Sequence, residues 1–137
     1  SWHSDARSDR GSPLHSLGCL MSVVQDLMNA AAADTDVLRS LDRSGDRFSA
    51  FRDVDFLLRA PDAAKADLVA SFVNDHSYGV ATVDGTDVHV VVHMPVEQSI
   101  ALCISGFYTC VAHLFQVEYD GWGCVAQSQP NPSLERP

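Results

Sequence analysis

Basic residues are scarce in this sequence. Its 137 residues include 9 Lys or Arg against 18 Asp or Glu, so the formal net charge is −9. Between Ala60 and Gln127 eight acidic residues stand against Lys65 as the one Lys or Arg, which gives −7. Proteins that bind nucleic acids need Lys and Arg to displace counterions from the phosphates. The composition therefore argues against direct nucleic-acid binding and favours a basic protein partner.

The patterns of an enzyme site or of a disulfide framework are also missing. None of the four cysteines belongs to a Cys-x-x-Cys pair, and Cys103 and Cys110 lie seven residues apart on one expected helix. We therefore expect buried free thiols in a reducing cytoplasm. The sequence has no glycine-rich phosphate loop and no serine elbow, so a nucleophile cannot be named. These features predict a protein that is not an enzyme and uses no cofactor.

Long hydrophobic runs are absent as well. No segment approaches the ~18 consecutive apolar residues of a membrane-spanning helix. Gln25 and Asp26 interrupt the N-terminal segment that would otherwise resemble the core of a signal peptide. We therefore expect a cytoplasmic protein that makes no membrane contact.

The sequence does contain enough apolar material for one folded domain. Hydrophobic residues make up 46% and charged residues 20%, which is an ordinary globular composition. Residues 1–20 have no steady hydrophobic period, and we expect them to be disordered or an upstream extension. The expected domain spans 21–127, with an N-terminal helical segment at 21–46 and a core at 47–127. Residues 128–137 include three prolines and are expected to form a loose tail.

Hydrophobic periodicity within the core predicts the element order βαββαβ. The expected strands are 51–60, 78–83, 87–94 and about 122–126, and the expected helices are 61–75 and 96–115. Asp84-Gly85 supplies a hairpin turn between the second and third strands. Right-handed crossovers then give a four-stranded antiparallel sheet with two helices on one face. We therefore predict an α+β, ferredoxin-like sandwich preceded by a helical segment, which Asp34-Thr35-Asp36 either interrupts or leaves whole.

The periodicity also predicts which apolar residues form the core. The first core helix is expected to turn one set of side chains inward: Ala64, Leu68, Val69, Phe72 and Val73. The second is expected to use a longer stripe: Val96, Ile100, Cys103, Ile104, Phe107, Val111 and Leu114. Together with the strands, we expect one shared core that includes Val54, Phe56, Leu68, Phe72, Val90, Val92, Ile104, Phe107 and Val111.

Polar residues alternate with apolar ones on the first and third strands. His89 and His93 project from one face of the third strand, and Asp53 and Asp55 project from the neighbouring first strand. Imidazole and carboxylate groups bind divalent metals, so one alternative function is a small metal- or ligand-binding domain that uses the open face of the sheet. The spacing matches no metalloenzyme motif, and polar residues are ordinary on the solvent face of a sheet. We therefore predict no useful metal affinity there.

Residues 117–123, Val-Glu-Tyr-Asp-Gly-Trp-Gly, combine two aromatic residues, two carboxylates and two glycines. Asp120-Gly121 is a turn dipeptide, so one interpretation assigns Gly121 and Gly123 to a structural turn that an aromatic side chain locks. The other interpretation is a protein-binding patch, because Tyr and Trp are common interface anchors and carboxylates receive Arg. The residues of this hypothetical patch are Glu118, Tyr119, Asp120 and Trp122.

The Tyr-Asp-Gly-Trp-Gly run at the end of a small α+β domain resembles the regulator of ribonuclease activity B family. The resemblance extends more loosely over residues 47–127 and implies the same fold class. It also implies a protein that binds and inhibits the endoribonuclease RNase E, or another basic protein of RNA processing. Pro-Asn-Pro-Ser-Leu-Glu-Arg near the C-terminus resembles a read-through gene-cassette recombination site. A mobile gene-cassette protein with an unrelated partner is therefore a further alternative.

Overall fold

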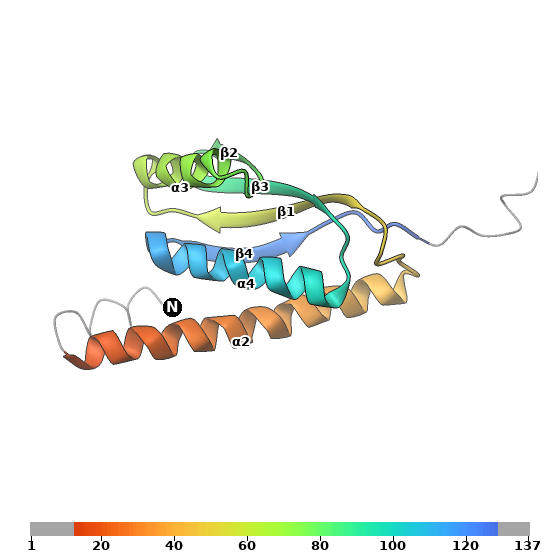
Figure 1. The fold of residues 1–137 in the computed structure, drawn as a ribbon, viewed down its shortest axis with the longest axis horizontal. Helices are drawn as coiled ribbons and strands as arrows, with labels where there is room; N and C mark the ends of the chain where they lie inside the picture. Colours follow the sequence, from red (N-terminus) through yellow and green to blue (C-terminus); the bar gives the residue numbers. More distant parts are fainter. Residues whose placement is uncertain (1–12, 129–137) are drawn as a thin grey trace, which may run out of the picture.

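The computed structural model describes residues 13–128, and it describes side chains from Ser22 onward. One helix precedes a βαββαβ core, as predicted (Figure 1). The elements are α2 (Pro13–Arg43), β1 (Arg52–Arg59), α3 (Ala63–Asp75), β2 (Val80–Asp84), β3 (Asp87–Met94), α4 (Gln98–Phe115) and β4 (Glu118–Gly123). Residues 1–12 and 129–137 lie outside the described residues, whereas residues 13–20 belong to α2, so the predicted boundary at residue 20 falls inside this helix.

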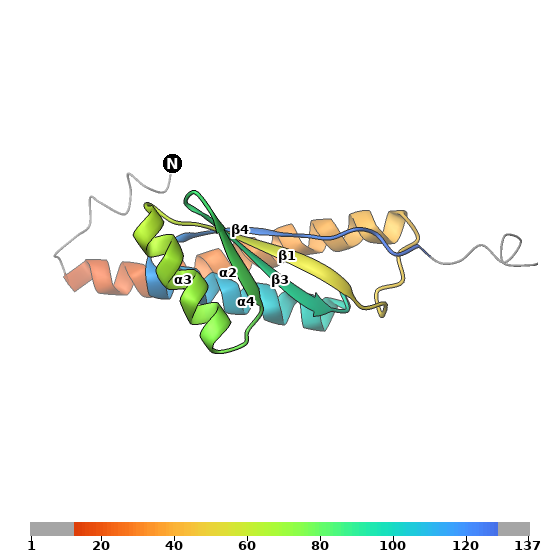
Figure 2. The ribbon, with the colours of Figure 1, turned by 90° about the horizontal axis from the view of Figure 1, so that it is seen from above.

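The four strands form one antiparallel sheet in the order β2-β3-β1-β4, which confirms the predicted ferredoxin-like arrangement (Figure 2). Alternation along β1 places Val54, Phe56 and Leu58 on the covered face, where all three are fully buried. Helix α3 contacts β2 and β3, and α4 contacts β1 and β4. The opposite face of the sheet carries exposed or half-buried polar residues and has no helix over it within the described chain.

Helix α2 is a third packing layer beside α4 (Figure 1). It begins at Pro13, earlier than the expected start near Ser22, and it continues without a break through Asp34 and Thr35. The Thr35 hydroxyl donates to the carbonyl of Ala31 at 2.8 Å, and Asp34 accepts a bond from another element. The Asp34 side chain therefore does not compete with the helical hydrogen bonds, and the Thr35 hydroxyl shares a backbone carbonyl of the helix without ending it.

The observed core differs from the predicted one on both core helices. On α3, Ala64 is exposed and Leu68 is 54% exposed, so both were wrongly predicted to face the core. The small residues Ala66 and Ala70 are buried instead, which lets α3 approach the sheet closely. On α4, Cys103 and Leu114 are exposed. The buried set on that helix is Ala101, Ser105, Tyr108, Thr109, Val111 and Ala112. Because α4 packs against α2 as well as the sheet, its buried surface is rotated away from its stripe of large apolar residues.

The remaining predicted core residues do lie in one cluster. Val54, Phe56, Val90 and Val111 are buried, while four others are partly buried against them: Phe72, Val92, Ile104 and Phe107. Partly buried aromatic rings join α3 to α4, because the Phe72 ring lies 5.1 Å from that of Phe115. The core is therefore continuous from β1 to both helices, as predicted.

The expectation of buried thiols was wrong for the two cysteines of α4. Cys103 and Cys110 are free and exposed, and Cys124 is half-buried. By length and composition, α4 also meets the requirements of a membrane-spanning helix, as many helices of soluble cores do. The sequence-based expectation had found no such segment. In this fold α4 packs on the sheet and along α2.

A buried ion pair fastens the chain before β1 to the segment after β4. Arg52 donates through Nη1 to Asp46 Oδ1 at 2.6 Å, and the same oxygen accepts the backbone N–H of Gln127 at 2.6 Å. Burial alone would raise the pKa of Asp46, but the bonds from Arg52 and Gln127 outweigh it and hold that pKa below its ordinary value. Both ends of the core are thereby tied together.

Candidate functional site

The uncovered side of the sheet is the candidate site, and it is called the open face below. It consists of the strand residues that point away from α3 and α4. On β1 and β3 these are Asp53, Asp55, Leu57, Arg59, Asp87, His89, Val91 and His93; on β2 and β4 they are Val80, Thr82, Asp84, Glu118, Asp120, Gly121 and Gly123. Six of them are acidic and Arg59 is the one Lys or Arg, so the open face has a net charge of −5 with neutral histidines.

The Val-Glu-Tyr-Asp-Gly-Trp-Gly segment forms strand β4, and its Asp-Gly pair is a bulge within the strand. Phe56 pairs with Trp122 and Leu58 pairs with Tyr119, so two residues of β4 lie opposite one residue of β1. Gly121 has a φ of +90°, a conformation that glycine adopts cheaply. The predicted turn at Asp120-Gly121 and the predicted strand at 122–126 were therefore wrong. An Asp-Gly pair fits both a turn and a bulge, and only the pairing with β1 distinguishes them.

Tyr119 and Trp122 point into the protein. The Trp122 indole is 9% exposed, and its Nε1–H donates to Asp34 Oδ1 on α2 at 2.9 Å. The Tyr119 hydroxyl lies 2.8 Å from Ser105 Oγ on α4, and burial raises the pKa of Tyr119 far above its ordinary value. These two side chains fasten β4 to both neighbouring helices. They do not form an exposed aromatic patch.

Asp34 is the residue of this network that sequence reasoning missed. Its carboxylate is 3% exposed, and burial raises its pKa against the opposing hydrogen bonds from Ser105 and Trp122. A signal for this burial exists in the sequence, because Asp34 lies three residues before Val37 and four before Leu38 on the apolar stripe of the helix.

The two carboxylates of the hypothetical patch do lie on the open face. Asp120 Oδ2 is 3.1 Å from Arg59 Nη2, and Asp87 Oδ1 is 4.0 Å from Arg59 Nε. Glu118 is half-buried and lies opposite Arg59 in the strand register. The structure thus separates the four patch residues into two that face outward and two that stabilise the fold.

The four residues of the metal-binding alternative form two separate pairs. His89 Nδ1 lies 3.4 Å from Asp55 Oδ2, and His93 Nδ1 lies 3.1 Å from Asp53 Oδ1. Across the side chains that the structure describes, no group of three or more His, Cys, Asp or Glu residues is placed to hold a metal ion. Asp53 and Asp55 thus form a row of carboxylates on β1, and each accepts one hydrogen bond from a histidine of β3.

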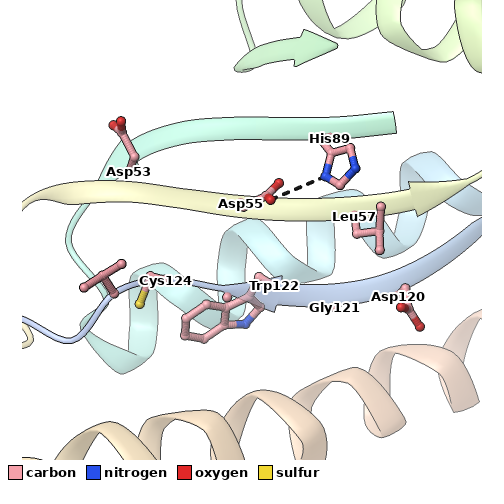
Figure 3. A pocket seen from close by; sticks show the side chains of 10 residues that line it. Asp53, Asp55, Leu57, His89, Asp120, Gly121, Trp122 and Cys124 are labelled. Carbon is pink, nitrogen blue, oxygen red and sulfur yellow. Dashed lines mark hydrogen bonds and ion pairs between the residues drawn. The ribbon is translucent and has the colours of Figure 1, made fainter. Parts of the chain in front are cut away.

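A shallow hollow of about 460 Å³ lies on the open face between β1 and β4 (Figure 3). Its apolar part is formed by Leu57, Trp122 and Val125, and Asp53, Asp55 and Asp120 lie at its rim. At Gly121 and Gly123 the backbone is bare on this side. The hollow is thus an acidic-rimmed depression with an apolar wall, open to solvent.

Comparison with protein families gives a match. The model of a protein family described as regulator of ribonuclease activity B matches residues 31–124, which is more than half of the chain. The matched range includes Asp34, the whole βαββαβ core and all of the open face. A search of curated proteins finds no match.

Proposed function

Because the chain belongs to the regulator of ribonuclease activity B family, we propose that it binds an endoribonuclease of the RNase E type and inhibits it through the open face. It acts as a protein ligand and catalyses no reaction. The single observation that carries the proposal, beside the family, is the charge of −5 on a sheet surface that no described element covers.

Charge complementarity makes a basic protein surface the fitting partner. RNA-processing enzymes hold phosphates with Lys and Arg, so an acidic sheet face competes for the same groups. Opposite potentials also speed the encounter and make it sensitive to salt. Inhibition then follows from occupation of the basic groups that the RNA substrate needs. The expected kinetic sign is a rise in KM for RNA with little change in kcat.

The firm support behind the open face favours this role. Its strands are fixed from behind by Val54, Phe56 and Leu58, all fully buried, and β4 is fastened to both neighbouring helices. A surface held in this way loses little conformational entropy on binding. We also assign this activity to the cytoplasm, since exposed free thiols such as Cys103 and Cys110 persist in a reducing compartment.

The proposal is tested with pairs of substitutions, each of which removes two negative charges and nearly keeps the size of the side chains. One open-face variant carries Asp53→Asn and Asp55→Asn, and a second carries Glu118→Gln and Asp120→Asn. The matched control carries Asp67→Asn and Asp75→Asn, which remove two exposed charges from α3 on the other side of the molecule. Binding to purified RNase E is measured by surface plasmon resonance, and RNA cleavage is measured in parallel.

Each open-face pair should weaken binding about tenfold at low salt, while the control stays within about twofold of the parent. The difference should shrink as salt screens the charges. Thermal melting should be nearly the same for all variants, because the substituted aspartates are exposed and Glu118→Gln keeps the size of the half-buried Glu118 side chain. Equal binding by all three variants and the parent at low salt would place the interface elsewhere.

Metal or ligand binding on the open face is the alternative, and the two histidine–aspartate pairs are the observation in its favour. Calorimetric titration with zinc, manganese and nickel decides between the two. We expect no sub-micromolar binding. Tight binding that His89→Ala abolishes would replace the protein-binding proposal with the metal-binding one.

A further inference from the structure

The hollow on the open face contains two glycines, and the backbone conformation requires only one of them to be glycine. At Gly121 the φ of +90° explains the glycine. Gly123 has no positive φ, and a Cβ atom there would have no atom within 4 Å other than those of its chain neighbours. Any strand-forming residue therefore fits at Gly123. The bare backbone at this position leaves space beside Asp55, its partner in the strand register, without serving the fold.

The walls of this space combine negative charge with an apolar surface. Asp53 and Asp55 line it on β1, and Leu57 and Val125 provide apolar contact. An arginine side chain matches both features, because its aliphatic stem packs on apolar groups while its planar guanidinium binds a carboxylate through two hydrogen bonds. A lysine ammonium is a compact point charge and uses such a surface less well.

The protein's own Arg59 shows that the open face accepts a guanidinium between its strands. It reaches from β1 to Asp120 on β4 at 3.1 Å, and its Nε lies 4.0 Å from Asp87 on β3. Arg59 thus neutralises one end of the face. At the other end, Asp55 pairs with the imidazole of His89 at 3.4 Å. A guanidinium is always charged and donates two parallel N–H bonds to a carboxylate, whereas His89 places one ring nitrogen near Asp55, so arginine is the stronger partner for this carboxylate.

We propose that the hollow between Leu57, Gly121 and Gly123 is an anchor site for one arginine side chain of the protein partner, with Asp55 as its principal carboxylate. The inference rests on the proposed function, since it names the chemistry by which the open face recognises a basic partner. Asp53, beside it on the same strand, supplies the second negative charge. The bare backbone at Gly123 admits the guanidinium to within contact of the sheet.

The test is an NMR titration of the full chain with N-acetyl-arginine amide as the probe. N-acetyl-citrulline amide is the control, because it has nearly the same shape and no charge. Saturable shifts are expected for the backbone amides of Gly121 and Gly123 with the arginine probe, and no saturable shifts are expected with citrulline. Gly123→Val fills the hollow without changing any charge. Thr82→Val places the same side chain on the open face away from the hollow.

Gly123→Val should weaken probe binding at least about tenfold, the factor that 1.4 kcal/mol represents. Thr82→Val should bind as the parent does, and both variants should melt within a few degrees of it. Equal probe binding by the parent and Gly123→Val, or shifts spread evenly over the open face, would overturn the anchor site and leave only diffuse electrostatic attraction.

Inhibition of RNase E by the same variants separates this inference from the proposed function. Weaker inhibition by Gly123→Val, together with parental inhibition by Thr82→Val, supports both. Parental inhibition by a Gly123→Val variant that no longer binds the probe would refute the anchor role and retain the proposed function. A parent that binds the probe but neither binds nor inhibits RNase E would refute the proposed function and the partner assigned to the site.

Discussion

Two buried aspartates should respond in opposite ways to the same substitution. Asp46 forms an ion pair with Arg52, whose side chain is itself buried, and it also accepts the N–H of Gln127. Asp46→Asn leaves the guanidinium without a compensating charge. Removal of one partner from a buried pair typically costs about 3–5 kcal/mol. Arg52 keeps the carbonyl of Arg47 at 2.7 Å as an acceptor, so we expect a loss of about 3 kcal/mol.

Asp34→Asn should be nearly neutral or stabilising. Asparagine retains an oxygen that accepts the Nε1–H of Trp122, so the hydrogen bond between α2 and β4 survives. The substitution removes a charge whose burial is unfavourable, as the raised pKa of Asp34 indicates. The expected change at pH 7 lies between zero and a gain in stability of about 1 kcal/mol, by the usual range for single hydrogen bonds.

The pH dependence of the two carboxylates has opposite signs. The pKa of Asp46 is lowered from 3.8 in the folded state, so its stabilising contribution is present above 3.8 and is lost as the pH falls through the lowered pKa. The pKa of Asp34 is raised from 3.8, so its contribution is present below 3.8 and is lost as the pH rises through the raised pKa. The free energy of unfolding of Asp34→Asn, relative to that of the parent, should therefore be higher at pH 7 than at about pH 4.

Urea unfolding of the parent and the two variants at both pH values measures these differences. The midpoint of Asp46→Asn should fall clearly below that of the parent at pH 7, with a similar slope against urea. The midpoint of Asp34→Asn should lie at or above the parental value. A loss in Asp34→Asn as large as that in Asp46→Asn would refute the reasoning, because it would mean that the charge of Asp34 stabilises the fold.

Three further substitutions test the fold. Gly121→Val should cost about 1–3 kcal/mol in urea unfolding, because a β-branched residue is strained at φ +90°, and an unchanged midpoint would contradict the bulge. Phe72→Ala should cost about 3 kcal/mol, the low end for such truncations, because Phe72 is partly buried; a loss below about 1 kcal/mol would deny it a place in the core. The Asn74 side chain bonds both the N–H and the carbonyl of Ala81 on the edge strand β2, at 2.9 and 3.0 Å. Asn74→Leu should free that edge and promote self-association in sedimentation velocity, whereas a variant as monodisperse as the parent would show that Asn74 does not protect it.

Local pattern was sufficient for the first three strands and for the order of the elements. The alternation of Val54, Phe56 and Leu58 with polar residues defines one buried face, because side chains of a strand point alternately to opposite sides. Asp84-Gly85 marks the hairpin between β2 and β3, where Gly85 has a positive φ. The open face and its carboxylates follow from the same alternation, which is why Asp53, Asp55, His89 and His93 were correctly placed on one surface.

Local pattern was not sufficient for the helix faces. The stripe of large residues on α4 predicted that Cys103 and Leu114 are buried, but both are exposed. Small residues such as Ala101 form the close contact instead, since α4 lies between the sheet and α2. Periodicity locates a hydrophobic stripe, and it does not show that a second neighbour will shift the buried surface.

The sequence by itself determined the βαββαβ order, the acidic side of the sheet and the special backbone at Gly121, because each depends on residues near one another in the chain. Tertiary structure alone decided the roles of Tyr119 and Trp122. Trp122 bonds Asp34, 88 residues earlier in the chain, and Tyr119 bonds Ser105 on another element. The presence of an aromatic residue in a sequence does not show whether its side chain faces solvent or the core. Its direction is set by the elements that pack beside it, and here α2 and α4 turn both rings inward and leave the carboxylates outside.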